Sequence, residues 1–166
     1  LRDMMYTAYK TPSPFVIRYP RGRGAGVAEG PMKEIETGKA EILRDGSDVA
    51  LLTLGTTASD GARAAEKAAQ QGVSVCHIDL RWAKPLDTEM LDYVGRNFKR
   101  VVTVEDGILN GGVGSGVTDW LAQNGYTPQI VSLGIDDRFM EQGTVKELVA
   151  MCGYDEKGIL TALLEQ

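Results

Sequence analysis

The feature that most constrains the fold is a regular alternation between short apolar runs and helix-forming segments. Residues 48–55 (DVALLTLG) form a continuous apolar run, which is typical of a strand buried on both faces of a parallel sheet. Residues 56–72 are rich in alanine, begin with threonine and end at Gly72, which predicts a helix. Repetition of this unit predicts a parallel sheet with helices on both of its faces.

The same alternation continues to the end of the chain. Further strands are predicted at residues 73–80, 100–106 and 128–134, and helices at 87–98, after the glycine loop that follows residue 106, and at about 143–151 and 155–165. Residues 39–44 precede the turn signal Asp45-Gly46-Ser47, which predicts a hairpin with residues 48–55 and so an antiparallel first strand. The predicted fold class is α/β, a three-layer α/β/α unit with a mixed five-stranded sheet and one antiparallel strand.

The N-terminal part of the chain does not follow this alternation. Residues 1–10 place apolar side chains at helical spacing, residues 15–19 (FVIRY) indicate a short strand, and the glycine-rich residues 22–38 indicate a linker. We therefore expect two parts, residues 1–36 and residues 37–166. Because the chain begins with Leu1 instead of methionine, we expect it to be a fragment of a longer protein.

Charge and composition argue against several classes of protein. The net charge of −5 opposes nonspecific binding to nucleic acid. No apolar run approaches the roughly 18–20 residues that span a bilayer, and no secretory signal opens the chain. Cys76 and Cys152 match no zinc-binding spacing, so we expect two free thiols in a reducing cytoplasm.

A glycine loop follows the strand predicted at residues 100–106. Its glycines are Gly111, Gly112, Gly114 and Gly116, and such a loop before a helix can gather backbone N–H groups around an anion. A dinucleotide fingerprint, however, has a different spacing and follows the first strand of its unit. The sequence therefore favours a tight turn and close helix packing over nucleotide binding.

Two pairs of neighbouring residues are candidates for chemistry. Glu105 and Asp106 end a predicted strand, where open α/β sheets place their sites, but a carboxylate there can equally cap the next turn or meet a partner chain. Cys76 and His77 are the types of a nucleophile and base, yet neighbours on a strand point to opposite faces. We therefore expect a structural or surface histidine.

Exposed contacts are suggested by two further segments. Arg18 and Arg21 flank the end of the strand predicted at residues 15–19, and arginine grips phosphate or carboxylate groups well, although a solvated loop is the simpler interpretation. Phe139 and Met140 lie among charged residues, which suits either a contact surface or a loop folded over the core.

Five longer segments follow one another along the chain: FVIRYPRG, GKAEILRDGSDVALLTLGT, DLRWAKPLD, VVTVEDGILNGGVGSGV and LGIDDRFMEQGT. In this order they resemble the C-terminal part of the 1-deoxy-D-xylulose-5-phosphate synthases, members of the transketolase-like thiamine diphosphate enzyme family. Each segment alone is a weak signal. All five in register extend the resemblance over nearly the whole chain, and it implies a fold like the transketolase C-terminal domain for residues 37–166.

The resemblance also implies a function. It implies that residues 1–36 are the end of the pyrimidine-binding domain plus a linker, and that the full-length homodimeric enzyme uses thiamine diphosphate and Mg²⁺. The implied reaction condenses pyruvate with glyceraldehyde 3-phosphate, with loss of carbon dioxide, to give a precursor of isoprenoids, thiamine and pyridoxal.

The resemblance assigns roles to a few residues here. It places Arg21, and less directly Arg18, near the substrate phosphate. It gives Glu105, Gly111, Gly112 and Gly114 a structural or interface role. Catalytic residues, metal ligands and bound cofactor are not expected in this chain, which alone should be inactive without the missing N-terminal domains.

Two alternatives stay open. The motif TVE followed by glycines is also similar to the C-terminal part of the beta chain of 2-oxoacid dehydrogenase first components. A non-catalytic α/β assembly module is the other alternative. Because residues 1–36 would lack the sheet of their own domain, we expect them to pack in an unusual way or to be mobile.

Overall fold

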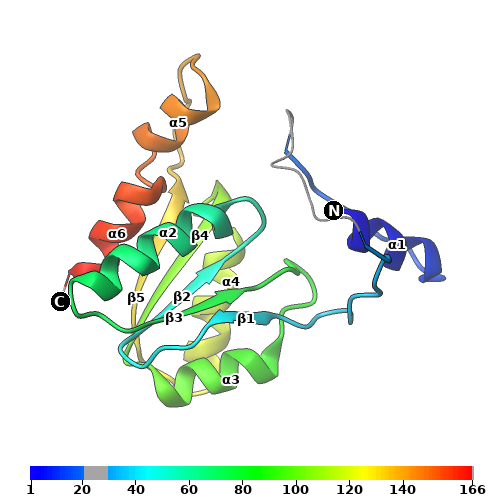
Figure 1. Ribbon diagram of the computed structural model, residues 1–166, viewed down its shortest axis with the longest axis horizontal. Coiled ribbons are helices and arrows are strands. Elements are labelled where there is room, and N and C mark those ends of the chain that lie inside the picture. Colours follow the sequence, from blue (N-terminus) through cyan, green and yellow to red (C-terminus); the bar gives the residue numbers. More distant parts are fainter. Residues whose placement is uncertain (21–29, 166) are drawn as a thin grey trace. The chain divides into compact units, whose positions relative to one another are not determined.

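The computed structural model describes residues 1–20 and 30–165, and the chain divides into two compact units (Figure 1). The first unit is Leu1–Thr37 and the second is Gly38–Gln166. Each unit is described by itself.

The second unit contains five strands and five helices in its described residues. The strands are β1 (Glu41–Arg44), β2 (Val49–Thr53), β3 (Val75–Asp79), β4 (Arg100–Ile108) and β5 (Gln129–Ile135). The helices are α2 (Thr57–Gln70), α3 (Thr88–Asn97), α4 (Val113–Gln123), α5 (Val145–Met151) and α6 (Glu156–Leu164). The elements predicted from residue 39 onward are all present, with bounds that differ by a few residues.

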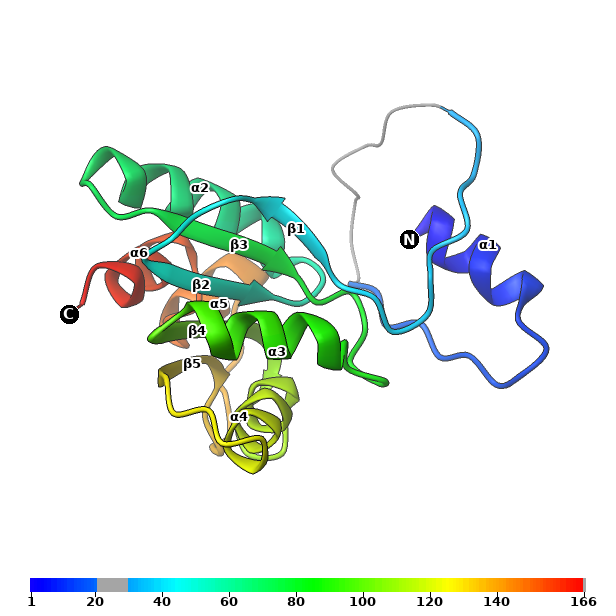
Figure 2. The ribbon, with the colours of Figure 1, turned by 90° about the horizontal axis from the view of Figure 1, so that it is seen from below.

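The strands form one mixed sheet in the order β1-β3-β2-β4-β5, with β1 and β5 at its two edges (Figure 2). Strands β3, β2, β4 and β5 are parallel, and β1 runs antiparallel to β3. The predicted fold class, a three-layer α/β/α unit with a mixed five-stranded sheet, is therefore confirmed.

The predicted hairpin between residues 39–44 and 48–55 is wrong, although the antiparallel direction of the first strand is confirmed. β1 pairs with β3, because both sides of β2 are occupied by β3 and β4. The connection to β2 crosses the start of β3, where the Ser47 N–H donates to Ser74 Oγ at 3.1 Å. A Cβ on Gly46 would lie 2.1 Å from the Val75 carbonyl carbon, so only glycine fits at this crossing.

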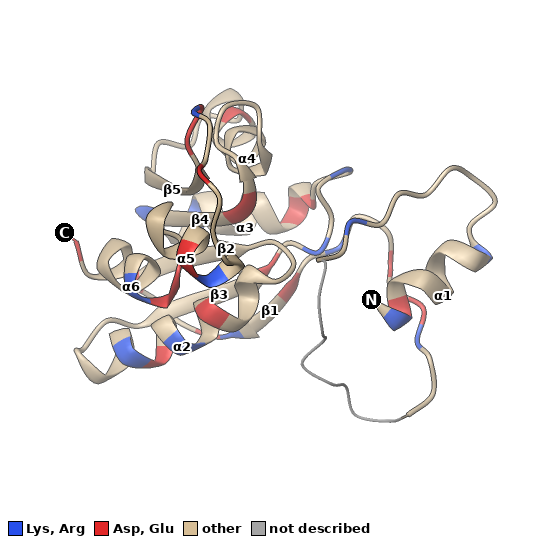
Figure 3. Ribbon diagram, turned by 90° about the horizontal axis from the view of Figure 1, so that it is seen from above, with Lys and Arg blue, Asp and Glu red and all other residues tan. Residues whose placement is uncertain are grey.

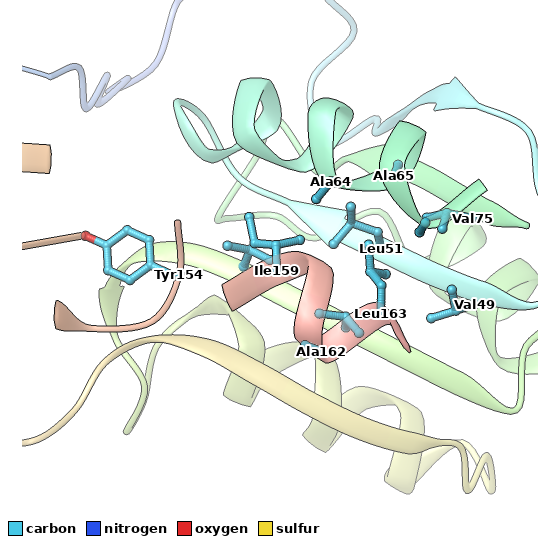
Figure 4. Packing of buried hydrophobic residues seen from close by; sticks show 12 residues of the cluster. Val49, Leu51, Ala64, Ala65, Val75, Tyr154, Ile159, Ala162 and Leu163 are labelled. Carbon is cyan, nitrogen blue, oxygen red and sulfur yellow. The ribbon is translucent and has the colours of Figure 1, made fainter. Parts of the chain in front are cut away.

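Each face of the sheet is covered by two helices through its own apolar cluster. One cluster packs α2 and α6 on alternate residues of β2 and β4; Leu51 of β2 and Ile159 of α6 lie together in it (Figure 4). Both are fully buried, as is Val102 of β4. The other packs α3 and α4 on the opposite face, with Leu52, Leu91 and Leu121 fully buried. This arrangement follows from alternation of side chains along a strand.

Three helices, α3, α5 and α6, begin with a capping side chain, whereas Thr56 at the start of α2 makes no such bond. Asp87 accepts hydrogen bonds from the N–H groups of Glu89 and Met90 at the start of α3, and Asp155 accepts from Gly158 N–H at the start of α6. Thr144 and Glu147 form a reciprocal capping box at the start of α5. Caps of this kind satisfy backbone donors that otherwise lack a partner at a helix start.

The first unit contains the predicted N-terminal helix, α1 (Arg2–Lys10). Residues 30–35 run along it: the Ile35 N–H donates to Thr7 Oγ1 at 2.9 Å, and Lys10 pairs with Glu34 at 3.1 Å. The strand predicted at residues 15–19 is wrong, since residues 14–20 have no regular secondary structure. Alternating side chains are not sufficient for a strand, which also requires a backbone partner.

Candidate functional site

The predicted site residues of the second unit meet where β4 ends and α4 begins. The carboxylate of Glu105 is buried and accepts two backbone hydrogen bonds there. Its Oε2 accepts from Val113 N–H at 2.9 Å, and its Oε1 accepts from Gly114 N–H at 2.8 Å. Of the arrangements that the sequence left open for Glu105, the structure shows the cap of the following helix. A carboxylate at this position is also favoured by the helix dipole.

The glycines of the loop make room for this carboxylate. A Cβ on Gly112 would lie 2.5 Å from Glu105 Oε1, and one on Gly114 would lie 2.6 Å from Thr103 Oγ1. Gly111 has φ +77°, a conformation that residues with a side chain rarely adopt. The loop therefore has the geometry of an anion site, but the side chain of Glu105 already occupies it.

A second position at the same end of the sheet is closed in a similar way. β2 and β4 are paired here, but the helices that follow them, α2 and α4, cover opposite faces of the sheet. Such a switch point is where open sheets bind ligands. The Thr57 hydroxyl accepts from Leu54 N–H at 3.2 Å and lies 3.2 Å from the Val104 carbonyl oxygen. This hydroxyl joins the two strand ends directly.

Asp106 points to the opposite face from Glu105 and accepts a hydrogen bond from the Tyr154 hydroxyl at 2.9 Å. Tyr154 is buried and precedes α6, so this bond ties the last helix to β4. The sequence indicated Asp106 as a candidate but contained no local signal for Tyr154, which lies 48 residues away.

His77 is a buried structural histidine. Its Nε2 lies 2.9 Å from Thr53 Oγ1, and burial, with a smaller contribution from the charge of Arg44, lowers the pKa of His77 to about 4. Cys76 belongs to the apolar cluster on the other face, where burial raises the pKa of its thiol. The two residues therefore do not form a nucleophile and base.

The remaining candidates lie in the N-terminal part of the chain and after β5. Arg18 is exposed in the first unit, and Arg21 lies outside the described residues. Phe139 is fully exposed, whereas Met140 is half-buried with its sulfur 3.9 Å from Cys152 Sγ. Of the two arrangements left open for these residues, the exposure of Phe139 suits a contact surface, and the burial of Met140 suits a loop folded over the core.

Sequence reasoning did not find the long-range role of Asp87. Besides capping α3, its Oδ2 accepts from Ala40 N–H at 3.0 Å, and Lys39 Nζ lies 3.7 Å from its Oδ1. These contacts fix the first residues of the second unit to the start of α3. The sequence placed Asp87 at the start of a predicted helix, but nothing local signalled a partner 47 residues away.

The donor groups of the described residues do not fit a diphosphate or its metal ion. No cluster of three or more His, Cys, Asp or Glu side chains suited to a metal exists among residues 1–20 and 30–165. The glycine-lined helix start, which could otherwise bind a phosphate, is filled by Glu105. In the same part of the chain, no helix combines the length and apolar character needed to cross a bilayer.

The chain is similar in sequence to known synthases over nearly its whole length. The chain is 50% identical to 1-deoxy-D-xylulose-5-phosphate synthase of Phocaeicola vulgatus over 99% of its length, and 49% identical to that of Bacteroides fragilis over 96%. These alignments cover 26% and 25% of the two relatives, so the chain spans about a quarter of their length. The resemblance derived from the five segments is confirmed.

The fold is also shared with a solved structure entitled "Split gene transketolase, inactive beta4 tetramer". The TM-score is 0.76 at 28% identity, and the match covers 84% of this chain and 46% of that one. The profile of the family described as "Transketolase, C-terminal domain" matches residues 38–159, which is most of the chain. The chain therefore belongs to the transketolase C-terminal domain family.

Proposed function

We propose that this chain is the C-terminal part of a thiamine diphosphate-dependent synthase that joins pyruvate to glyceraldehyde 3-phosphate with loss of carbon dioxide. The product would be 1-deoxy-D-xylulose 5-phosphate, which feeds isoprenoid, thiamine and pyridoxal synthesis. The observation that carries the proposal is the 50% identity to a protein of that name over 99% of the chain. The curated relatives favour this assignment over a 2-oxoacid dehydrogenase beta chain, since they bear the synthase name.

In this proposal the second unit is architectural. Glu105, Gly111, Gly112 and Gly114 build a self-contained turn, which supports a structural role for them. Thiamine diphosphate and Mg²⁺ would bind to the N-terminal domains, which account for the other three quarters of a relative's length. Those domains are the expected partners, in a cytoplasmic homodimer.

The isolated chain is expected to be inactive for the same reason. The solved structure that shares the fold is named an inactive tetramer, and we transfer the expectation of inactivity to this chain. In the full-length enzyme, Arg21 and, less directly, Arg18 would hold the phosphate of glyceraldehyde 3-phosphate. Arginine suits this role because its guanidinium can donate two parallel hydrogen bonds to a phosphate.

A chimera tests the proposal directly. The aligned C-terminal quarter of the Phocaeicola vulgatus synthase is replaced by this chain, and product formation is measured with pyruvate, glyceraldehyde 3-phosphate, thiamine diphosphate and Mg²⁺. We expect synthase activity from the chimera and none from this chain alone. A folded but inactive chimera, or turnover by the isolated chain, would contradict the proposal.

Substitutions in the active chimera test the arginines. Losing a charge-assisted hydrogen bond costs about 1.5–3 kcal/mol, so Arg21→Ala should raise KM for glyceraldehyde 3-phosphate by roughly 10–100-fold. KM for pyruvate should stay the same, because pyruvate has no phosphate. Arg23→Ala is the matched control, two residues away in the same segment, and an equal effect there would reject the specific role of Arg21.

A further inference from the structure

The two edges of the sheet differ in their protection against pairing with another strand. Proteins protect an edge with short strands, charged side chains and irregularities in register. β1 has all three: it has four residues, it carries Glu41 and Arg44, and its register shifts between Ile42 and Arg44. β1 is therefore poorly suited to accept a further strand.

β5 lacks the first two of these protections. It is a strand of seven residues without charge or proline, and its register with β4 is regular from Gln129 to Leu133 and shifts once, between Leu133 and Ile135. Figure 3 shows β5 free of the charges that mark the neighbouring helices and loops. Among the described residues, only β4 pairs with β5. The other edge of β5 is thus open to a strand.

The direction of the backbone groups along β5 follows from its hydrogen bonds. Gln129 N–H donates to the Lys99 carbonyl at 2.8 Å, and the Ile135 carbonyl accepts from Leu109 N–H at 2.9 Å. In a parallel pair, alternate residues direct both backbone groups to the same neighbour. The odd-numbered residues therefore face β4, and Ile130 and Ser132 direct their N–H and C=O groups outward.

A groove lies beside this edge on the face covered by α6. It has a volume of about 500 Å³, and its walls combine small or apolar residues, among them Val131, Leu133 and Ala162, with the charged residues Asp155, Lys157 and Glu165. Val131 and Leu133 are only partly buried. The groove can receive apolar side chains of a strand that pairs with the edge.

We propose that the outer edge of β5 pairs antiparallel with β5 of a second copy of this chain, which extends the sheet across a two-fold axis. Antiparallel pairing about a two-fold axis brings the residue on the axis opposite its own copy and its neighbours close to theirs, so like charges near the axis would repel each other. The chain as a whole has a net charge of −5, which opposes close approach elsewhere, but residues 129–135 carry none. This proposal does not depend on the proposed function.

The register follows from the outward-facing groups. Ile130 of each copy exchanges backbone hydrogen bonds with Ser132 of the other, and Val131 lies opposite its own copy on the side of the groove. Because the paired stretch is short, we expect this dimer to be weak and to dissociate as the chain is diluted.

The test measures the association of the full chain by sedimentation velocity over a range of concentrations. Ser132→Pro removes an outward N–H without removing a bond to β4, which is where an edge strand tolerates proline. Ser132→Ala is the matched control, since it loses the hydroxyl that accepts from Thr103 Oγ1 at 3.0 Å but keeps the N–H. Val131→Lys independently places two like charges across the axis.

We expect Ser132→Pro and Val131→Lys to raise the dimer dissociation constant at least tenfold, and Ser132→Ala to change it less than twofold. The amides of Ile130 and Ser132 should also exchange hydrogen more slowly as the concentration of the unsubstituted chain rises. Circular dichroism checks the fold of each variant, and if Ser132→Pro does not fold, Val131→Lys and the exchange data decide. A chain that stays monomeric, or a dimer that all three variants leave intact, overturns the proposal.

Discussion

Glu105 and His77 are both buried ionisable side chains, and they lie under opposite faces of the same sheet. Glu105 lies at the start of α4 and receives two backbone N–H groups at 2.9 and 2.8 Å. His77 lies under the second turn of α2, where its Nε2 is 2.9 Å from the Thr53 hydroxyl, and its pKa is lowered to about 4. The two sites differ in which part of a helix covers them.

The difference shows how this fold accommodates polar groups in its interior. A helix start presents free N–H donors and suits a carboxylate, whereas the middle of a helix has its backbone groups already paired and suits a neutral imidazole. Both sites need glycine for the close approach, Gly114 in one and Gly61 in the other. In both sites the partner of the buried polar side chain comes from the chain itself.

The largest effect is expected from removing the carboxylate. Glu105→Ala leaves two buried N–H groups without an acceptor and creates a cavity, which should lower the free energy of unfolding by about 3 kcal/mol. Glu105→Gln keeps one acceptor oxygen, so its free energy of unfolding should lie between those of the unsubstituted chain and Glu105→Ala. Urea unfolding measures the loss, with the exposed Glu141→Ala as a control expected within about 0.5 kcal/mol. A loss below about 1 kcal/mol for Glu105→Ala would show that the cap is not important.

The next effect is a loss of stability at low pH that arises from His77. His77 has a folded pKa of about 4 against 6.5 for an ordinary histidine, so the unfolded chain binds its proton first as the pH falls. The contribution of neutral His77 to the free energy of unfolding is complete above pH 6.5 and is lost as the pH falls from there toward 4. By pH 5 the loss should be about 2 kcal/mol relative to pH 7.

His77→Gln is the matched variant, because glutamine keeps a hydrogen-bonding group for Thr53 but does not titrate. Chemical denaturation at pH 7 and pH 5 should give a pH-dependent loss that is about 2 kcal/mol smaller in the variant. Equal pH dependence of the two proteins would mean that protonation of His77 is not coupled to folding.

Sequence patterns predicted the elements of the second unit well, because apolar alternation and capping residues are local signals. They did not predict which strands are neighbours. The turn Asp45-Gly46-Ser47 has the composition of a hairpin, yet β1 pairs with β3, since β2 is buried between two parallel strands. Strand order depends on contacts across the whole sheet, which a local turn does not encode.

For the candidate site, the sequence likewise indicated the position of the residues but not their contacts. The end of β4 and the glycines were indicated by position, but that Glu105 fills the glycine loop depends on distances between atoms of the folded chain. The Thr53–His77 pair depends on the register of β2 against β3 and had no sequence signal. The roles of Arg18 and Arg21 stay predictions.

A pair of glycine substitutions tests whether space at the Glu105 site is required. A Cβ on Gly114 would lie 2.6 Å from Thr103 Oγ1, so Gly114→Ala should destabilise the fold by about 1–2 kcal/mol. The matched control is Gly116→Ala in the same helix, where the nearest atom is Leu86 Cδ1 at 3.5 Å. That variant should stabilise the fold by about 0.5–1 kcal/mol through helix propensity, as thermal unfolding would show. Equal effects would mean that the glycines are not selected for space.

The smallest effect concerns Asp106, whose partner is a side chain instead of a helix end. Tyr154→Phe removes the hydroxyl that donates to Asp106 at 2.9 Å and keeps the buried ring, so it should cost about 1 kcal/mol. Tyr9→Phe, at a side chain that is 89% exposed, is the control and should change stability by less than about 0.5 kcal/mol. Urea unfolding of both variants decides. A cost near zero for Tyr154→Phe would mean that α6 is fixed to β4 by apolar packing alone, and a cost near that of Glu105→Ala would mean that a side-chain partner is worth as much as a helix start.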